Sequence, residues 1–118
     1  MAERGEVWIA HLGRGGGRSP GKTRPVLLVQ AQALIQAEHP TTLVIPMTTN
    51  LAEDAAPLRI RIPAQGKLHE DSDLLMDQIR PVDNRRLVRG PLARLSKETM
   101  ESVGRAMGEV LDLSTARS

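Results

Sequence analysis

The sequence contains no cysteine, no phenylalanine and no tyrosine, and it has a single tryptophan among 118 residues. Without cysteine the chain cannot form a disulfide framework, and it offers no thiolate as a nucleophile or metal ligand. With one aromatic side chain it cannot build the stacking platform on which RRM and OB modules bind single-stranded nucleic acid. Any contact with RNA must therefore depend mainly on charge and hydrogen bonds.

Long apolar runs are also lacking. The longest uninterrupted aliphatic run, residues 26–29, is far shorter than the ~20 residues that a transmembrane helix needs. The first six residues include Glu3, Arg4 and Glu6 and have no apolar stretch of the signal-peptide type. We expect a soluble, cytoplasmic protein. The length predicts a single domain over residues 1–113, followed by a polar tail at residues 114–118.

The net charge is only +2, but the basic residues are concentrated in two segments. Residues 13–24 contain four cations and no acid, namely Arg14, Arg18, Lys22 and Arg24. Residues 80–94 contain five arginines against one acid, Asp83; they are Arg80, Arg85, Arg86, Arg89 and Arg94. The first segment is glycine-rich, and basic loops of this kind steer and hold nucleic acid, although the same residues would also serve solubility alone.

Short apolar segments separated by turn residues predict a mainly β protein. The expected strands are residues 5–12, 26–30, 43–47, 58–62, one or two within 72–82, and 87–95. A short helical turn is expected near residues 31–38. Ser96 is a candidate N-cap for an amphipathic helix whose apolar positions run from Met100 to Leu111. The pattern indicates a small antiparallel, partly closed β-barrel with a C-terminal α-helix.

The clearest alternation lies at residues 58–62, where Arg59 and Arg61 alternate with three apolar side chains. This predicts a half-exposed strand with a basic outer face. Residues 69–73, His69-Glu70-Asp71-Ser72-Asp73, bring carboxylates and an imidazole together. They lack the glycine and the spaced ligands of a calcium loop, so we expect a solvated acidic turn and no metal site.

Polar residues of three kinds border apolar runs. Pro25 is expected to mark the entry of a strand, which places Arg24 at the edge of a rigid element. Thr48 and Thr49 follow a second apolar run, and Asp77 closes a third. An arginine before a strand is most often a surface residue. If these strand ends converge, however, a guanidinium, a hydroxyl and a carboxylate share one rim and suit phosphodiester chemistry.

Four motifs occur in order along nearly the whole chain, and together they resemble the MazF/PemK family of toxin endoribonucleases. They are Gly5-Glu6-Val7-Trp8, Thr23-Arg24-Pro25-Val26-Leu27-Leu28-Val29, Ile45-Pro46-Met47-Thr48-Thr49-Asn50 and Asp77-Gln78-Ile79-Arg80. No single motif is specific, and the resemblance depends on their order and spacing. It implies an SH3-like barrel of the CcdB/PemK/MazF kind, a homodimer, sequence-selective cleavage of single-stranded RNA, and neutralisation by a MazE-like antitoxin.

The resemblance assigns the catalytic pair to Arg24 and Thr48. The implied chemistry needs neither metal nor cofactor: the ribose 2′-hydroxyl attacks its own phosphate, leaving a 2′,3′-cyclic phosphate and a 5′-hydroxyl. The donors of Arg24 suit the charge that develops on the phosphate oxygens, and Thr48 would hydrogen-bond the scissile phosphate. Further RNA contacts are expected from Arg14, Arg18, Ser19, Lys22, Thr49 and Arg80.

The resemblance leaves the general base open. Many family members carry a glutamate five residues before the motif arginine, where this chain has Ser19. Some also use an arginine two residues before the aspartate of the Asp-Gln pair, where this chain has Leu75. Asp77 and His11 remain candidates for the proton transfer, although a lone histidine at a strand end is more often incidental.

The alternative is a binding protein on the same barrel without catalysis, either an RNA-binding module or a gyrase inhibitor of the CcdB kind. CcdB-like proteins end in Trp-Gly-Ile, and this sequence ends in Thr115-Ala116-Arg117-Ser118, which disfavours gyrase. A pure RNA binder would retard RNA in a gel without shortening it.

Overall fold

The computed structural model describes residues 2–13 and 22–113, a part of the chain that forms seven strands, two α-helices and two short 3₁₀ helices. The loop residues Arg14, Arg18 and Ser19 lie outside it, as does the tail at residues 114–118. In chain order the elements are β1 (Glu6–His11), β2 (Thr23–Leu28), α1 (Gln32–Gln36), β3 (Thr41–Thr48), β4 (Arg59–Ile62), β5 (Ser72–Leu75), η1 (Met76–Gln78), β6 (Arg80–Asp83), η2 (Asn84–Arg86), β7 (Leu87–Arg94) and α2 (Lys97–Val110). None of the helices in this part is both long and apolar enough to cross a membrane.

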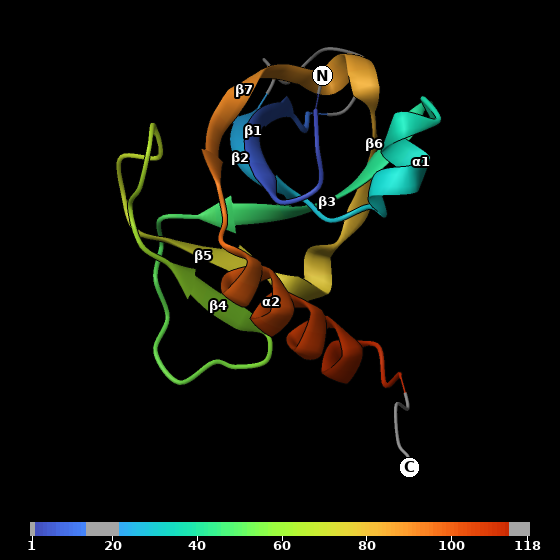
Figure 1. The fold of residues 1–118 in the computed structure, drawn as a ribbon. Coiled ribbons are helices and arrows are strands. Elements are labelled where there is room, and N and C mark those ends of the chain that lie inside the picture. The colour runs from blue at the N-terminus through green and yellow to red at the C-terminus, as the bar shows by residue number, and fades with distance from the viewer. Residues whose placement is uncertain (1, 14–21, 114–118) are drawn as a thin grey trace.

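All strand pairs are antiparallel, and the sheet runs in the order β4-β5-β3-β2-β1-β7. The first half of β3 pairs with β6, and its second half pairs with β5. The sheet curls strongly around β1, β2 and β7, while β4 and β5 extend it beyond β3 toward α2 (Figure 1). The predicted mainly β fold, a partly closed barrel with a C-terminal helix, is confirmed.

The two faces of the sheet carry separate apolar clusters, as the alternation of side chains along strands requires. The larger cluster joins one face to α2 and includes Val7, Leu27, Ile45, Leu74 and Val103. The smaller cluster lies on the other face and consists of Ala10, Val26, Leu28, Val44 and Val82, with Trp8 packed against it. Each residue of β2 and β3 can therefore be assigned to a face from its neighbours.

Strand β2 begins earlier than expected. Pro25 was predicted at the strand entry, but β2 starts at Thr23 and Pro25 lies opposite Ile9 of β1. Strand β3 pairs with β2 only from Val26 onward, so the proline precedes the part of the strand that is paired on both sides, where its missing N–H is tolerated. Arg24 consequently lies inside a strand, opposite Ala10.

The acidic segment differs most from expectation. Residues 69–73 were predicted to form a solvated turn, which is wrong for the last two: Ser72 and Asp73 are each 1% exposed. They belong to β5, which lies between β3 and β4 and is buried along its whole length. Burial of this carboxylate requires positively charged partners, and the neighbouring strand β4 provides them.

The helical predictions are confirmed. A short helix, α1, covers Gln32–Gln36, and α2 begins after Ser96, whose hydroxyl accepts a hydrogen bond from the backbone N–H of Thr99 at 3.0 Å. Val103 and Ala106 form the buried face of α2. The helix thereby closes the larger cluster, and the strand ends that carry Arg24 and Thr48 lie on the sheet that it supports.

Candidate functional site at the ends of strands β2 and β3

Arg24 and Thr48 lie on neighbouring antiparallel strands. In the register of β2 and β3, Val26 pairs with Pro46, and the same register continued two residues further brings Arg24 level with Thr48. Both residues are partly buried. Directly opposed side chains on adjacent strands have Cβ atoms roughly 5 Å apart, close enough for both to reach one phosphate group.

The two side chains also share a face of the sheet. Arg24 alternates with Val26 along β2, and Thr48 alternates with Val44 and Pro46 along β3, so both extend the face of the smaller apolar cluster. Arg80 is opposite Val44 and is exposed on this same face. The sequence prediction that Arg24 and Thr48 converge at one rim is thus supported by the pairing.

Thr48 is held by a local hydrogen bond. Its hydroxyl oxygen accepts from the backbone N–H of Asn50 at 3.1 Å, which leaves the hydroxyl proton free to donate. Thr49 follows directly and is exposed. Lys22 is also exposed just before β2, and its carbonyl accepts from the N–H of Leu12. The residues expected to contact RNA from the described part of the chain are therefore accessible.

Asp77 lies in η1, the 3₁₀ turn after β5, and is exposed. Along β3 it falls between the levels of Met47, which pairs with Leu74, and Val44, which pairs with Arg80. The 3₁₀ turn that contains Asp77 forms no ladder pair with β3 within the described residues. Asp77 therefore borders the same strand as Thr48 without lying beside it in the register.

His11 ends β1 opposite Thr23, one position beyond the Ala10–Arg24 pair. Because side chains alternate along a strand, His11 extends the face opposite to that of Arg24. Its Nδ1 lies 3.3 Å from Nη1 of Arg86, and the same guanidinium nitrogen donates to the carbonyls of His11 and Gly13. Arg86 thus fixes the entrance of the basic loop, and His11 belongs to this arrangement.

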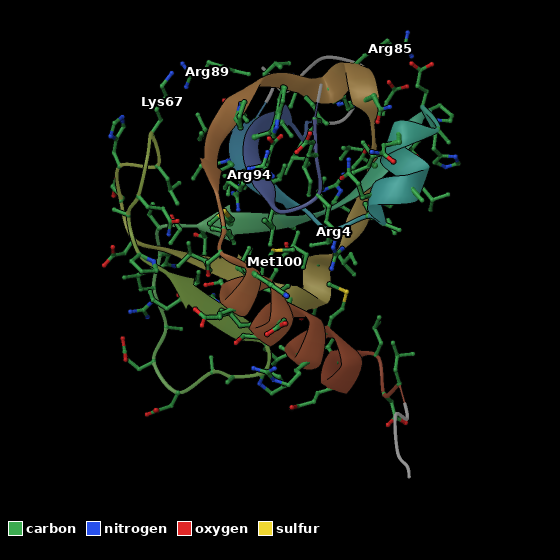
Figure 2. All side chains as sticks on the ribbon, in the orientation of Figure 1. Arg4, Lys67, Arg85, Arg89, Arg94 and Met100 are labelled. Carbon is green, nitrogen blue, oxygen red and sulfur yellow. The ribbon has the colours of Figure 1, made fainter. Side chains whose placement is uncertain are left out.

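The second basic segment does not form one surface. Arg85 forms an ion pair with Asp83, which holds the pKa of that carboxyl at about 2, and Arg94 reaches Glu3 and Glu6. Figure 2 shows Arg85 and Arg89 extending outward along the rim of the fold, whereas Arg94 lies further down β7. The sequence grouped these arginines, but their strand positions and counter-ions separate them.

One charged cluster was missed by the sequence analysis. Asp73 lies opposite both Thr48 of β3 and Arg61 of β4. Its carboxylate accepts from Arg61 Nε at 2.6 Å, from Arg59 Nη1 at 3.2 Å, and from the N–H of Ala52 at 2.9 Å. The available signal was an acid that directly precedes the apolar run Leu74-Leu75-Met76, because a carboxylate buried at the start of such a run requires cationic partners.

These bonds determine the ionisation of Asp73. Burial opposes its charged form, but the hydrogen bonds from Ala52, Arg61 and Arg59 outweigh it and lower the pKa of Asp73 below the ordinary carboxyl value. The carboxylate is therefore ionised near neutral pH and balances one of the two guanidinium charges.

The chain matches a known protein family over most of its length. Residues 3–111 match the family model described as PemK-like, MazF-like toxin of type II toxin–antitoxin system. The chain belongs to this family. The predicted resemblance is confirmed over nearly the whole sequence. A curated relative, the endoribonuclease MazF of Staphylococcus saprophyticus, is 34% identical over 119 aligned residues, covering 100% of this chain and 98% of the relative.

Solved structures share the fold. The Mycobacterium tuberculosis toxin MazF-mt6 superposes with a TM-score of 0.75 at 22% identity, covering 92% of this chain and 98% of that one. A mycobacterial endoribonuclease in complex with its cognate antitoxin gives a TM-score of 0.76 at 20% identity, covering 98% and 100% of the two chains. MazF in a MazE–MazF structure from Deinococcus radiodurans gives 0.76 at 20% identity, with 96% and 97% covered. At these identities the likeness shows the fold.

Proposed function

We propose that this toxin-family protein is a sequence-selective, metal-independent endoribonuclease that cleaves single-stranded messenger RNA in the cytoplasm. The observation that carries the proposal is the register of β2 and β3, which, continued two residues beyond the Val26–Pro46 pair, brings Arg24 level with Thr48 on one face. A guanidinium and a hydroxyl in this arrangement can bind one phosphodiester from two directions. Family membership and the curated relative's name support RNA as the substrate.

The reaction divides between the RNA and the protein. The 2′-oxygen forms a bond to its neighbouring phosphorus, the bond from phosphorus to the 5′-oxygen breaks, and the proton lost by the 2′-hydroxyl is balanced by one delivered to the leaving oxygen. Because the nucleophile belongs to the RNA, the protein's task is to align it and stabilise charge. Arg24 donates hydrogen bonds to the equatorial phosphate oxygens, and the hydroxyl of Thr48 donates a hydrogen bond to one of them.

A proton acceptor for the 2′-hydroxyl is also needed. We assign it to Asp77, which lies in the turn directly after β5, the strand that pairs with β3 at Thr48, and which is exposed. His11 is the weaker candidate because it extends the opposite face and its Nδ1 is close to the guanidinium of Arg86. Arg14, Arg18, Ser19, Lys22, Thr49 and Arg80 are proposed to contact the RNA on either side of the scissile phosphate.

The same proposal includes the partners expected of such a toxin. A cognate antitoxin of the MazE type would neutralise the protein, and two copies of this chain would form a homodimer. Structures of relatives with MazE or a cognate antitoxin support the first of these. Co-purification with a co-expressed MazE-type antitoxin and sedimentation of the free toxin would test the two separately.

The experiment that tests the activity is mapping of cut sites on a long RNA in EDTA with wild-type protein and Arg24→Ala. The wild type should leave 3′ ends that resist ligation until the cyclic phosphate is opened and the resulting phosphate is removed, and 5′ ends that a kinase labels directly. Arg24→Ala should fold normally and cut at least roughly 10³-fold more slowly. RNA that is retarded in a gel but never shortened would support the binding protein instead.

A further inference from the structure

A row of charged and polar residues crosses four strands on the face of the proposed cleavage site. Thr48 of β3 pairs with Asp73 of β5, and Asp73 pairs with Arg61 of β4. On the other side of Thr48, the register of β2 and β3, continued two residues beyond the Val26–Pro46 pair, brings Arg24 of β2 level with it. Because paired residues project to the same face, Arg24, Thr48, Asp73 and Arg61 form one line across the sheet. Arg59 is on this face too, opposite Leu75.

The middle of this row is rigid. Asp73 is 1% exposed and accepts hydrogen bonds from Arg61, Arg59 and the Ala52 N–H. The two guanidinium groups bind the loop after Thr48 as well, because Arg59 donates to the Asn50 carbonyl at 2.8 Å and Arg61 to the Ala52 carbonyl at 3.2 Å. Each arginine is therefore held at several points, and little conformational freedom remains to be lost on binding a ligand.

Both arginines retain donors for a ligand. The hydrogen bonds that they form within residues 2–13 and 22–113 use Nη1 of Arg59 and Nε and Nη2 of Arg61. Arg59 Nε and Nη2 and Arg61 Nη1 keep their N–H groups, and the two side chains are 26% and 36% exposed. A buried carboxylate thus holds two guanidinium groups whose remaining donors reach the surface.

We propose that Arg59 and Arg61 form a second phosphate-binding subsite, which holds an RNA phosphate other than the scissile one. This inference rests on the proposed function, because it takes the RNA bound at Arg24 and Thr48 as its ligand. Arginine forks match the oxygens of a phosphodiester, and Asp73 acts as the positioning residue that fixes their geometry.

The spacing agrees with this role. Three strand steps separate Arg24 from Arg61, or roughly 14 Å between their backbones, and both side chains are long. A single RNA strand lying across β2, β3, β5 and β4 would therefore present the scissile phosphate at one end of the row and a further phosphate at the other. Glu53 contacts Arg61 at 3.2 Å from an 83% exposed position, so the RNA phosphate can displace it.

An acidic segment of a protein partner is the competing occupant, since carboxylates also bind arginine forks. RNA is favoured because the row is continuous with Arg24 and Thr48, so that one bound strand can contact both ends.

The test compares Arg59→Gln with wild type on a set of oligoribonucleotides that each carry one neutral methylphosphonate at a different position. Cleavage of unmodified RNA locates the cut first, and binding is then measured on oligonucleotides with a 2′-deoxy nucleotide at the cut. At one position outside the scissile phosphate, neutralisation should weaken wild-type binding roughly tenfold. Arg59→Gln should weaken binding of unmodified RNA by a similar factor. A methylphosphonate at that position should then weaken binding to the variant no further.

A control is available on the helix. Arg105 is exposed on α2 and donates only to Ser102 within the described part of the chain. Arg105→Gln should leave the methylphosphonate pattern of the wild type intact. Arg59→Gln is preferred to Arg61→Gln because the 2.6 Å bond from Arg61 still satisfies Asp73. The salt dependence of RNA binding should also fall by about 0.7 in slope for Arg59→Gln, and less for Arg59→Lys.

Equal losses for Arg59→Gln at every position would overturn the subsite, because a general disturbance of the fold does not single out one phosphate. Unchanged RNA binding with weakened binding of a polyglutamate peptide would also overturn it and assign the surface to a protein partner. If the wild type never cuts RNA, the proposed function is refuted. If the wild type cuts RNA but Arg59→Gln removes no position-specific effect of the methylphosphonates, only the subsite is refuted.

Discussion

Thr48 and Asp73 face each other across the antiparallel pair of β3 and β5. One is a half-buried hydroxyl at the proposed cleavage site, and the other is a buried carboxylate that carries two arginines. The loop after Thr48 is bonded to this cluster through Asn50 and Ala52. The geometry of Thr48, the proposed catalytic threonine, is therefore tied to an ion-pair cluster one strand away.

Replacing Thr48 by valine tests the hydroxyl while preserving side-chain shape. The variant loses the donor to the phosphate and the acceptor for the Asn50 N–H, and kcat should fall roughly 10²-fold. Thr48→Ser should retain most of the activity. Thr49→Val is the matched control, because an RNA contact outside the reacting phosphate should raise KM and leave kcat nearly constant. Equal loss of kcat in both valine variants would contradict the assignment.

The proton acceptor can be identified from pH–rate profiles of Asp77→Asn and His11→Gln. If Asp77 removes the 2′-hydroxyl proton, its amide variant should lose the rise of kcat with pH in the acidic limb and fall roughly 10²-fold at neutral pH. His11→Gln should keep the shape of the wild-type profile, since His11 extends the face opposite to that of Arg24. The reverse pattern would transfer the role to His11.

Asp73 should contribute to stability in a pH-dependent way. Its pKa is lowered in the folded protein, so its contribution is present above the ordinary carboxyl pKa and is lost as pH falls through the lowered folded value. Asp73→Asn should reduce the free energy of unfolding by on the order of 2 kcal/mol at pH 7. Urea denaturation of both proteins from pH 7 to pH 2 measures the free energy of unfolding. If the difference in this free energy between wild type and variant stays constant down to pH 2, the ion pairing of Asp73 does not contribute as proposed.

Two glycines should respond oppositely to alanine. A Cβ on Gly90 would lie 2.4 Å from Cδ2 of Trp8, so Gly90→Ala must displace the indole and should cost about 2 kcal/mol. Gly104 is exposed on α2 with nothing within 4 Å of the added Cβ, and Gly104→Ala should stabilise by roughly 0.5–1 kcal/mol. Chemical denaturation of the two variants and the wild type would measure both changes in the free energy of unfolding. Similar effects of the two substitutions would show that the close approach of Gly90 to Trp8 is relieved at little cost.

The sequence predicted the strands well where side-chain alternation and turn residues agree, as at residues 58–62 and at the Ser96 cap. It could not predict the partners of those strands, because register is a tertiary property. Arg59 and Arg61 were predicted on an exposed basic face, and only the pairing of β4 with β5 places Asp73 between them. Arg24 and Thr48 could be identified by motif, whereas their common level follows from the pairing of β2 with β3.

The candidate base shows the same limit. Asp77 was selected because it closes an apolar run, and that position alone does not specify where the carboxylate lies relative to Thr48. The 3₁₀ turn that follows β5 shifts it along β3. A polar side chain at a strand end therefore does not by itself specify which residues of the neighbouring strand it lies beside.

Trp8 is the only strong fluorophore of the chain. Its ring packs against the smaller apolar cluster and against Gly90, its Nε1 donates to Glu6, and its strand partner Val26 is two residues from Arg24. The emission of this single indole will report changes in the region where β1 packs beside β2 and β7, without an added label. Rapid mixing with RNA or with a MazE-type antitoxin, the proposed ligands, can therefore follow events at the proposed cleavage face in the unmodified protein, in real time.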